Sequence, residues 1–251
     1  MLNQLVLQFA RCANFNSVNR GELTISVLDA EIAMGPLNEV EKRNCPAKLF
    51  LAGDPSLLKN GKRVSLVGSR EATERGLEAA SKLAALLARN DIIVVSGLAK
   101  GIDTASHRGS IAAKGRTIAV IGTPLEEYYP KENRDLQTEI ADSHLLISQF
   151  PPGYPSNKSN FPMRNRTMAL ISDATVIVEA GESSGTLHQG WEALRLGRPL
   201  WIMESTANNA KLSWPKEMIK YGARVLGQNT LAELLETLPS STRDERSQLT
   251  I

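Results

Sequence analysis

The sequence predicts an α/β fold: an extended Rossmann-like core whose open, mainly parallel sheet has helices on both faces, preceded by a small N-terminal extension. Between residues 63 and 238, short runs of β-branched residues alternate with longer helical patterns. This alternation is typical of a parallel sheet with crossover helices. The length of 251 residues suits one such domain with short additions.

The chain divides into three parts. Residues 1–44 are an extension of unclear fold, in which residues 23–27 alternate as a strand does and apolar side chains near the start recur at helical spacing, namely Leu2, Leu5, Val6 and Phe9. Residues 45–238 form the core domain. The tail 239–251 is polar, and we expect it to be disordered.

The core begins with a short apolar strand at 49–51, which Gly53, Asp54 and Pro55 end. Six further strands are expected from apolar, β-branched runs, and a seventh closes the series. These strands lie at 63–67, 92–95, 117–121, 145–147, 175–178, 200–203 and 223–226.

Helices are expected between these strands, where apolar residues recur every three to four positions. The predicted helices are 77–87, 103–114, 133–140, 164–171, 187–196, 216–221 and 231–238. Asp103 is expected to be the N-cap of the second of them. The stretch 149–162 is rich in proline and polar residues, so we expect a loop there. Its length of about 14 residues is unusual for a connection and favours a functional loop.

Short polar motifs follow the predicted strands, and ligands of open parallel sheets bind beyond the carboxyl ends of the strands. Gly68-Ser69-Arg70 follows the first core strand, where a dinucleotide-binding protein would carry GxGxxG; Arg70 occupies the place of the second glycine, which disfavours NAD. Arg70 instead offers a planar fork of donors to a phosphate. A surface arginine without ligand is the alternative.

The second candidate motif is Ser96-Gly97, after the next strand, where the glycine lets backbone amides approach an anion. A tight strand-to-helix turn explains it equally. The third, Ser184-Gly185, opens a predicted helix whose amides and hydroxyls could hold a phosphate, with a plain N-cap at Ser183 or Ser184 as the alternative.

The segment Lys158–Arg166 joins three cations, two amides and one aromatic ring within nine residues, namely Lys158, Asn160, Phe161, Arg164, Asn165 and Arg166. Cations on phosphates and aromatic faces under bases are how proteins hold single-stranded nucleic acid. Arg164 and Arg166 point in different directions on a helix, so we expect one of them to face the ligand. For Phe161, burial in the core is the alternative.

Composition excludes several other classes. The formal net charge is +2, so a nucleic-acid site must be a local concentration of charge. The sequence has two cysteines without a CxxC pattern and three histidines without the spacing of metal ligands. We therefore expect no metal site and no cofactor, and a location in the reducing cytoplasm. There is no apolar run long enough to span a membrane, and the start lacks a signal-peptide pattern, so we expect a cytosolic protein.

Six segments resemble one family in order and spacing. They are VSLVGSR (64–70), the stretch 94–123 that begins VVSGLAKGID, YYPKENR (128–134), LLISQFPPG (145–153), the stretch 160–180 that begins NFPMRNR, and the stretch 184–201 that begins SGTLHQG. The chain is thereby similar, over about residues 45–238, to the DprA/Smf DNA-processing proteins.

This resemblance implies an extended Rossmann fold, sequence-independent binding of single-stranded DNA, homodimerisation, and transfer of incoming DNA to a RecA-type recombinase during natural transformation. It places Arg70, Lys158, Phe161, Arg164 and Arg166 along the DNA pocket. No catalytic residue is expected.

Two alternatives remain open. One is a Rossmann domain that senses a nucleotide ligand, for example in defence. The other is a nucleoside-monophosphate phosphoribohydrolase, whose glycine motif is echoed at Ser184–Thr186. There Gln189 takes the place of the catalytic carboxylate, and an amide cannot act as the base.

Overall fold

A computed structural model describes residues 18–20 and 23–239. Within these residues one sheet has the strand order β1-β2-β3-β7-β6-β5-β4-β8-β9-β10. The strands are β1 (Val18–Arg20), β2 (Leu23–Asp29), β3 (Lys48–Gly53), β4 (Lys62–Gly68), β5 (Ile92–Ser96), β6 (Thr117–Ile121), β7 (Leu145–Ser148), β8 (Ala174–Glu179), β9 (Leu200–Met203) and β10 (Arg224–Leu226).

Across the sheet, the neighbouring strands β7, β6, β5, β4, β8, β9 and β10 pair in parallel. At one end of the sheet, β2 pairs antiparallel with β3, and β3 pairs antiparallel with β7. This confirms the open, mainly parallel sheet expected from the sequence. The chain builds β5, β6 and β7 to one side of β4 and then returns to add β8, β9 and β10 on the other. The topological switch point therefore lies between β4 and β8.

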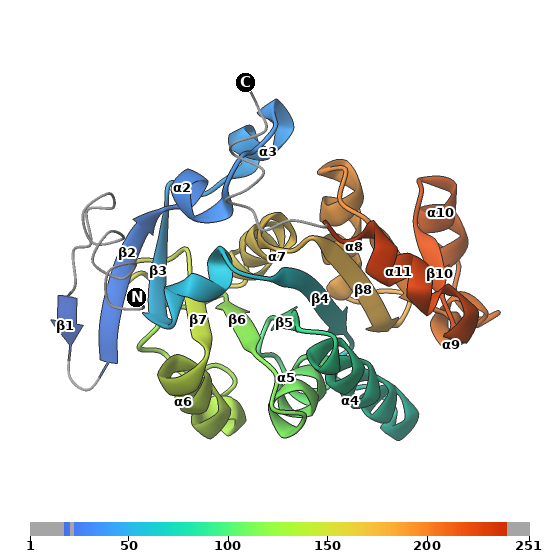
Figure 1. Cartoon of the computed structure of the whole chain (residues 1–251), viewed down its shortest axis with the longest axis horizontal. Helices are drawn as coiled ribbons and strands as arrows, with labels where there is room; N and C mark the ends of the chain where they lie inside the picture. Colours follow the sequence, from blue (N-terminus) through green and yellow to red (C-terminus); the bar gives the residue numbers. More distant parts are fainter. Residues whose placement is uncertain (1–17, 21–22, 240–251) are drawn as a thin grey trace.

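Helices cover both faces of the sheet (Figure 1). On one face α4, α5 and α6 pack side by side, and on the other lie α7, α8 and the N-terminal helices α2 and α3. Their bounds are α2 (Ala30–Met34), α3 (Glu39–Asn44), α4 (Glu74–Arg89), α5 (Ile102–Ala112), α6 (Arg134–Ser143), α7 (Asn160–Ile171), α8 (Thr186–Arg195), α9 (Glu204–Ala207), α10 (Trp214–Lys220) and α11 (Leu231–Thr237), with 3₁₀ turns at Pro55–Leu58, Lys131–Asn133 and Gln228–Thr230.

The core strands are buried because helices shield both faces. Every residue of β5, β6 and β7 is buried, which explains why these strands read as continuous apolar runs in the sequence. Helix α4 adds Ala80, Leu83, Ala84 and Leu87 to the core on its own face, as its apolar stripe predicted.

Helix α7 begins earlier than the sequence predicts. The stretch expected to be a loop as far as Pro162 ends at Ser159, and Asn160, Phe161 and Pro162 form the first helical turn. A proline is tolerated there because the first N–H groups of a helix have no intrahelical partner. The candidate residues of this stretch are therefore fixed to a helix rather than to a loop.

The segment 23–44 joins the same sheet. β2 pairs with β3, and the buried side chains of α2 belong to the core cluster under α7 and α8. The helical pattern at Leu2–Phe9 and the tail 240–251 lie outside the described residues, so both predictions stay untested.

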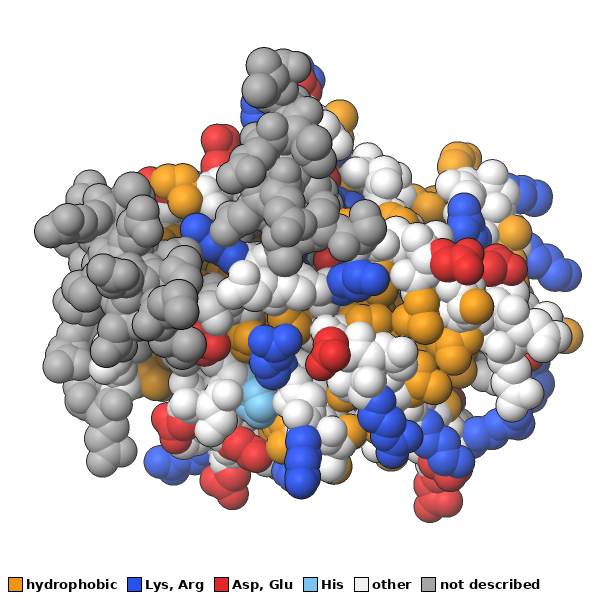
Figure 2. All heavy atoms as spheres, viewed as in Figure 1, with side chains coloured by type: hydrophobic (Ala, Val, Ile, Leu, Met, Phe, Trp, Pro, Cys, Tyr) orange, Lys and Arg blue, Asp and Glu red, His pale blue; other side chains and the backbone are white. Residues whose placement is uncertain are grey.

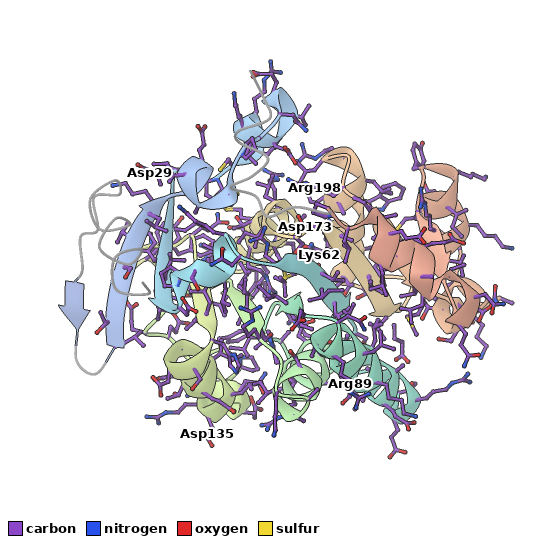
Figure 3. All side chains as sticks on the ribbon, in the orientation of Figure 1. Asp29, Lys62, Arg89, Asp135, Asp173 and Arg198 are labelled. Atoms are coloured by element: carbon purple, nitrogen blue, oxygen red, sulfur yellow. The ribbon has the colours of Figure 1, made fainter. Side chains whose placement is uncertain are left out.

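A buried ion pair joins α3 to the turn before β9. Arg198 Nε donates to Glu41 Oε1 at 2.7 Å, and the other Glu41 oxygen accepts from the Asn38 N–H at 2.9 Å, closing a capping box. Arg198 lies between α3 and α8 in Figure 3. Both side chains are mostly buried, so neither charge can be hydrated if the other is removed.

We expect Glu41→Ala to lower the free energy of unfolding by about 2 kcal/mol, because it strands the Arg198 charge and removes a helix cap. Urea denaturation measures this loss. Glu39→Ala is the matched control on the same helix, since Glu39 is exposed and its pair with Lys42 is expected to contribute less than about 1 kcal/mol. Equal stability of the two variants would contradict a role for the buried pair.

Candidate nucleic-acid interface

A pocket of about 480 Å³ lies at the switch point between β4 and β8, where ligands of open parallel sheets bind. Its walls come from the segments that follow β4, β5 and β8 and from α7. The structure thus brings together eight of the residues that the sequence singled out: Gly68, Ser69, Arg70, Phe161, Arg164, Asn165, Ser184 and Gly185.

The turn that carries Arg70 is fixed by its neighbours. The Ser69 N–H donates to the Glu179 carbonyl oxygen at 2.7 Å, the Ile102 N–H donates to the Ser69 carbonyl oxygen at 3.2 Å, and Thr186 Oγ1 donates to the Gly68 carbonyl oxygen at 2.8 Å. Gly101, at φ 74°, packs so closely on the Ser69 carbonyl that a Cβ there would overlap it. Arg70 therefore projects from a rigid backbone.

The Arg70 guanidinium is exposed and lies 5.4 Å from the centroid of the Phe161 ring. The same ring packs against Tyr129, with the two ring centroids 5.4 Å apart. Phe161 is half-buried. One part of its ring packs against the protein, and another part lines the pocket, so burial and pocket lining are both present. Its contact orients Arg70 at the pocket rim.

Arg164 faces the pocket floor. Its side chain is buried, and Nη1 donates to the Val120 carbonyl oxygen at 2.9 Å. The buried carboxylate of Asp103 is the opposite charge that acts on it. Burial outweighs Asp103 and lowers the pKa of the Arg164 guanidinium, yet a guanidinium keeps its charge. Arg164 thus places a fixed positive charge under the pocket.

Asp103 does not cap α5 as predicted. The N-cap is Gly101, while the Asp103 carboxylate turns inward, accepts from the Ala99 N–H at 3.3 Å and lines the pocket floor. Burial raises the pKa of the Asp103 carboxyl, and the Arg164 charge and the Ala99 N–H oppose this effect only in part.

Arg166 lies outside the pocket lining. Its Nε and Nη2 donate to the two oxygens of Glu192 on α8 at 3.1 and 3.2 Å, so this guanidinium clamps α7 to α8. Of the two helical arginines, Arg164 lines the pocket and Arg166 does not. That one of them faces a ligand stays a prediction.

Four other candidate residues also lie outside the pocket lining. Ser96 is buried and its Oγ donates to the Leu66 carbonyl oxygen, while Gly97 packs against the Arg164 guanidinium. Asn160, the first residue of α7, is buried. Lys158 is exposed on the loop before α7 and has no ion pair among the described residues.

The opposite wall is the start of α8. Its N-cap is Gly185, without a side-chain cap, so neither Ser183 nor Ser184 caps the helix as the plain alternative required. Ser184 Oγ instead accepts from the Thr186 N–H at 3.2 Å. A polar wall of hydroxyls and the positive end of a helix dipole thus face the pocket, an arrangement that favours anions.

The sequence assigns no site role to Glu179, Tyr129 or His188, although Glu179 stands in a polar motif at the end of a predicted strand. The Glu179 carboxylate accepts from the Thr73 N–H at 2.8 Å and from its hydroxyl at 2.6 Å, which positions the start of α4 beside Arg70. An acidic residue ending a strand was the available signal. His188 is exposed in the pocket wall, one position before Gln189.

Figure 2 shows basic and acidic side chains interspersed over one face of the molecule, as expected from a net charge of +2. The pocket lining itself is mixed, since it contains Glu71 and Asp103 beside Arg70 and Arg164. Among the described residues, no cluster of three or more His, Cys, Asp or Glu side chains is placed to hold a metal ion. The helices of the described part are too short or too polar to cross a membrane.

His107 lies behind the pocket and is fully buried. Thr117 Oγ1 donates to the Val94 carbonyl oxygen, so the 2.7 Å contact between this hydroxyl and His107 requires Nδ1–H to be the donor. Nε2 is then a buried nitrogen without a hydrogen-bond partner. Burial, with smaller contributions from His144 and Arg164, lowers the pKa of His107 to about 3.

We expect this histidine to make the protein acid-sensitive. In the unfolded chain His107 takes up a proton below a pKa of about 6.5. In the folded protein it stays neutral down to about pH 3, so between these two pH values protonation favours the unfolded state. Stability should fall with pH across this window, by about 2 kcal/mol at pH 5. Urea denaturation at pH 7 and 5 should show a smaller difference for His107→Gln than for wild type; an unchanged difference would remove His107 from the account.

The matches to known proteins cover most of the chain. A family model described as DNA recombination-mediator protein A matches residues 24–239, so the match includes β2, α2 and α3. Two relatives are each called DNA processing protein DprA. The one from Bacillus subtilis (strain 168) is 37% identical over 77% of this chain and 65% of its own length, and the one from Streptococcus pneumoniae is 38% identical over 79% and 70%. The chain thus spans just under two thirds of the first relative.

Solved structures share the fold. The X-ray structure of DNA processing protein A from Streptococcus pneumoniae superposes with a TM-score of 0.70 at 32% identity, covering 93% of this chain and 78% of that one. A structure concerned with the single-stranded DNA binding mode of DNA processing protein A from Helicobacter pylori gives a TM-score of 0.70 at 24% identity, over 90% and 97% of the two chains. Because the identity to the Helicobacter pylori protein is only 24%, this similarity is evidence for a shared fold and for nothing further.

Proposed function

The chain belongs to the family of DNA recombination-mediator protein A, and from that membership we propose that it binds single-stranded DNA independently of base sequence at the β4–β8 pocket. The observation that carries the proposal is the arrangement of Arg70, Arg164 and the start of α8 around one cavity. Each offers positive charge or N–H donors to phosphate, and contacts to phosphate carry no information on base sequence.

The proposed roles follow from exposure. Arg70 contacts a phosphate directly because its fork is exposed and its backbone is fixed. Arg164 acts from below as a buried charge. The Gly185 amide and the Ser184 hydroxyl hold a phosphate from the opposite wall, since the Ser184 amide already donates to the Gly181 carbonyl oxygen at 3.2 Å. Lys158, on the exposed loop, attracts the strand as it approaches. Ser96, Gly97 and Asn160 shape the pocket without touching DNA.

We propose that the protein acts without catalysis. In the amide orientation that its neighbours favour, buried Gln189 donates to the Asn165 carbonyl oxygen and accepts from the Ala169 N–H. It thus ties α8 to α7 and has no proton to exchange at the place where a phosphoribohydrolase needs a carboxylate. Release of free base from a nucleoside monophosphate would contradict this proposal.

By family resemblance we also propose a cytoplasmic homodimer that hands incoming single strands to a RecA-type recombinase. Light scattering on the purified chain tests the dimer, and strand-exchange assays with a recombinase test the transfer. A monomer at micromolar concentration would contradict the first, and unchanged recombinase loading the second.

The binding proposal is tested by mobility shifts with labelled oligonucleotides. Poly-dT, poly-dA and mixed single strands of equal length should bind with similar affinity, and a blunt duplex more weakly. The control is Arg89→Ala, which removes an exposed cation at the far end of α4 (Figure 3). Absence of single-strand binding at low salt would overturn the proposed function.

A further inference from the structure

The rim of the pocket beside Phe161 carries exposed aromatic and basic side chains that the proposed phosphate site leaves unused. They lie on residues 128–134, which run from the loop after β6 to the first residue of α6. Tyr128 and Tyr129 are 37% and 45% exposed. Lys131 and Arg134 are exposed as well, and neither forms an ion pair with another described residue.

Tyr129 connects this segment to the pocket. Its ring packs on Phe161 with an interplanar angle of 45°, and Phe161 also contacts the Arg70 guanidinium. A third neighbour closes the edge of Phe161, because a Cβ on Gly122 would lie only 2.8 Å from its Cδ1. Phe161 is thus surrounded by protein on several sides, whereas nearly half of Tyr129 is open. Tyr129 therefore offers an open aromatic surface beside Phe161.

The segment is held firmly enough to serve as a platform. Asn133 is buried, and its Nδ2 donates to the Leu98 carbonyl oxygen at 2.9 Å and to Thr104 Oγ1 at 2.8 Å, which ties the segment to the start of α5. The Arg134 guanidinium lies 5.1 Å from the centroid of the Tyr128 ring. Little conformational freedom remains to be lost on binding.

We propose that residues 128–134 form a second subsite for single-stranded nucleic acid, in which Tyr129 stacks on a base outside the pocket and Lys131 and Arg134 supply charge for the adjacent phosphates. This rests on the proposed function of the pocket. Single-stranded nucleic acid is bound by aromatic rings that stack on its bases and by cations that contact its phosphates. Exposed rings interleaved with cations that form no ion pair provide both kinds of contact. The strand leaves the pocket past Arg70 and Phe161 and continues over Tyr129.

The test is an abasic scan. Oligo-dT of fixed length carries one abasic position, moved along the strand, and its affinity is measured for wild type, Tyr129→Ala and Tyr129→Leu. For wild type, removing the base that Tyr129 holds should weaken binding about 5- to 150-fold. Both variants should bind intact oligo-dT correspondingly more weakly and lose sensitivity to that one abasic position. Tyr129→Phe should behave as wild type.

Tyr221→Ala is the matched control. Tyr221 is 68% exposed, and its ring packs on Trp191 rather than on the pocket rim. It should match wild type in affinity and in its abasic profile. If wild type binds oligo-dT but the Tyr129 variants show its affinity and profile, the second subsite is overturned while the function of the pocket stands. If wild type binds no oligonucleotide, both are overturned.

Discussion

The Gly97→Ala variant is expected to lose about 3–5 kcal/mol of unfolding free energy. A Cβ on Gly97 would overlap the Arg164 guanidinium and lie 2.7 Å from Asp103 Oδ2. Arg164 must then move, which breaks its bond to the Val120 carbonyl oxygen and leaves the Asp103 carboxylate buried without its counter-charge. Replacing glycine with alanine restricts the unfolded chain by only about 0.4–1 kcal/mol, too little to compensate.

Urea denaturation measures the effect, and Gly181→Ala is the matched control. A Cβ on Gly181 meets no atom within 4 Å, so its stability should stay within about 0.5 kcal/mol of wild type. If Gly97→Ala is as stable as Gly181→Ala, Arg164 can leave the pocket floor freely, and the account of that floor is wrong.

The Arg70→Ala variant is expected to bind single-stranded DNA about 100-fold more weakly. Hydrogen bonds to charged groups contribute about 1.5–3 kcal/mol each, and the exposed Arg70 guanidinium is proposed to make one or two of them to phosphate. The loss should be equal for poly-dT and poly-dA, because phosphate contacts carry no base information. Fluorescence anisotropy with labelled oligonucleotides measures it.

Arg166→Ala provides the comparison within the same motif. Its guanidinium is held by both oxygens of Glu192 and lies outside the pocket lining, so its removal should change DNA affinity by less than about threefold. The opposite ranking, with Arg166→Ala the weaker binder, would show that the strand runs over the junction of α7 and α8 instead of through the pocket.

Periodicity predicted most of the core elements because shielding on both sides makes strands such as β6 uniformly apolar. The start of α7 was mispredicted, since Pro162 resembles a loop residue in sequence and is harmless only in a first helical turn. The order of the strands did not follow from the sequence, because local pattern carries no information on which strand returns beside β4.

The sequence predicted where on the sheet the candidate site lies, but it did not predict most of the contacts within the site. Motifs after consecutive parallel strands had to meet at one edge, and they do. Which of Arg164 and Arg166 faces the pocket depended on Asp103 and Glu192, which lie far away in sequence. Tyr129 was missed because an exposed ring is informative only once its neighbour Phe161 is known.

The most direct test of the central claim is the salt dependence of single-strand binding by the wild-type chain. If the pocket neutralises phosphates, the logarithm of the association constant should fall linearly with the logarithm of salt concentration, with a slope of about 0.7 per phosphate contacted. Two or three contacts in the pocket predict a slope of roughly 1.4–2.1 for a short oligonucleotide. Binding that is absent at low salt, or that does not change with salt, would contradict the account.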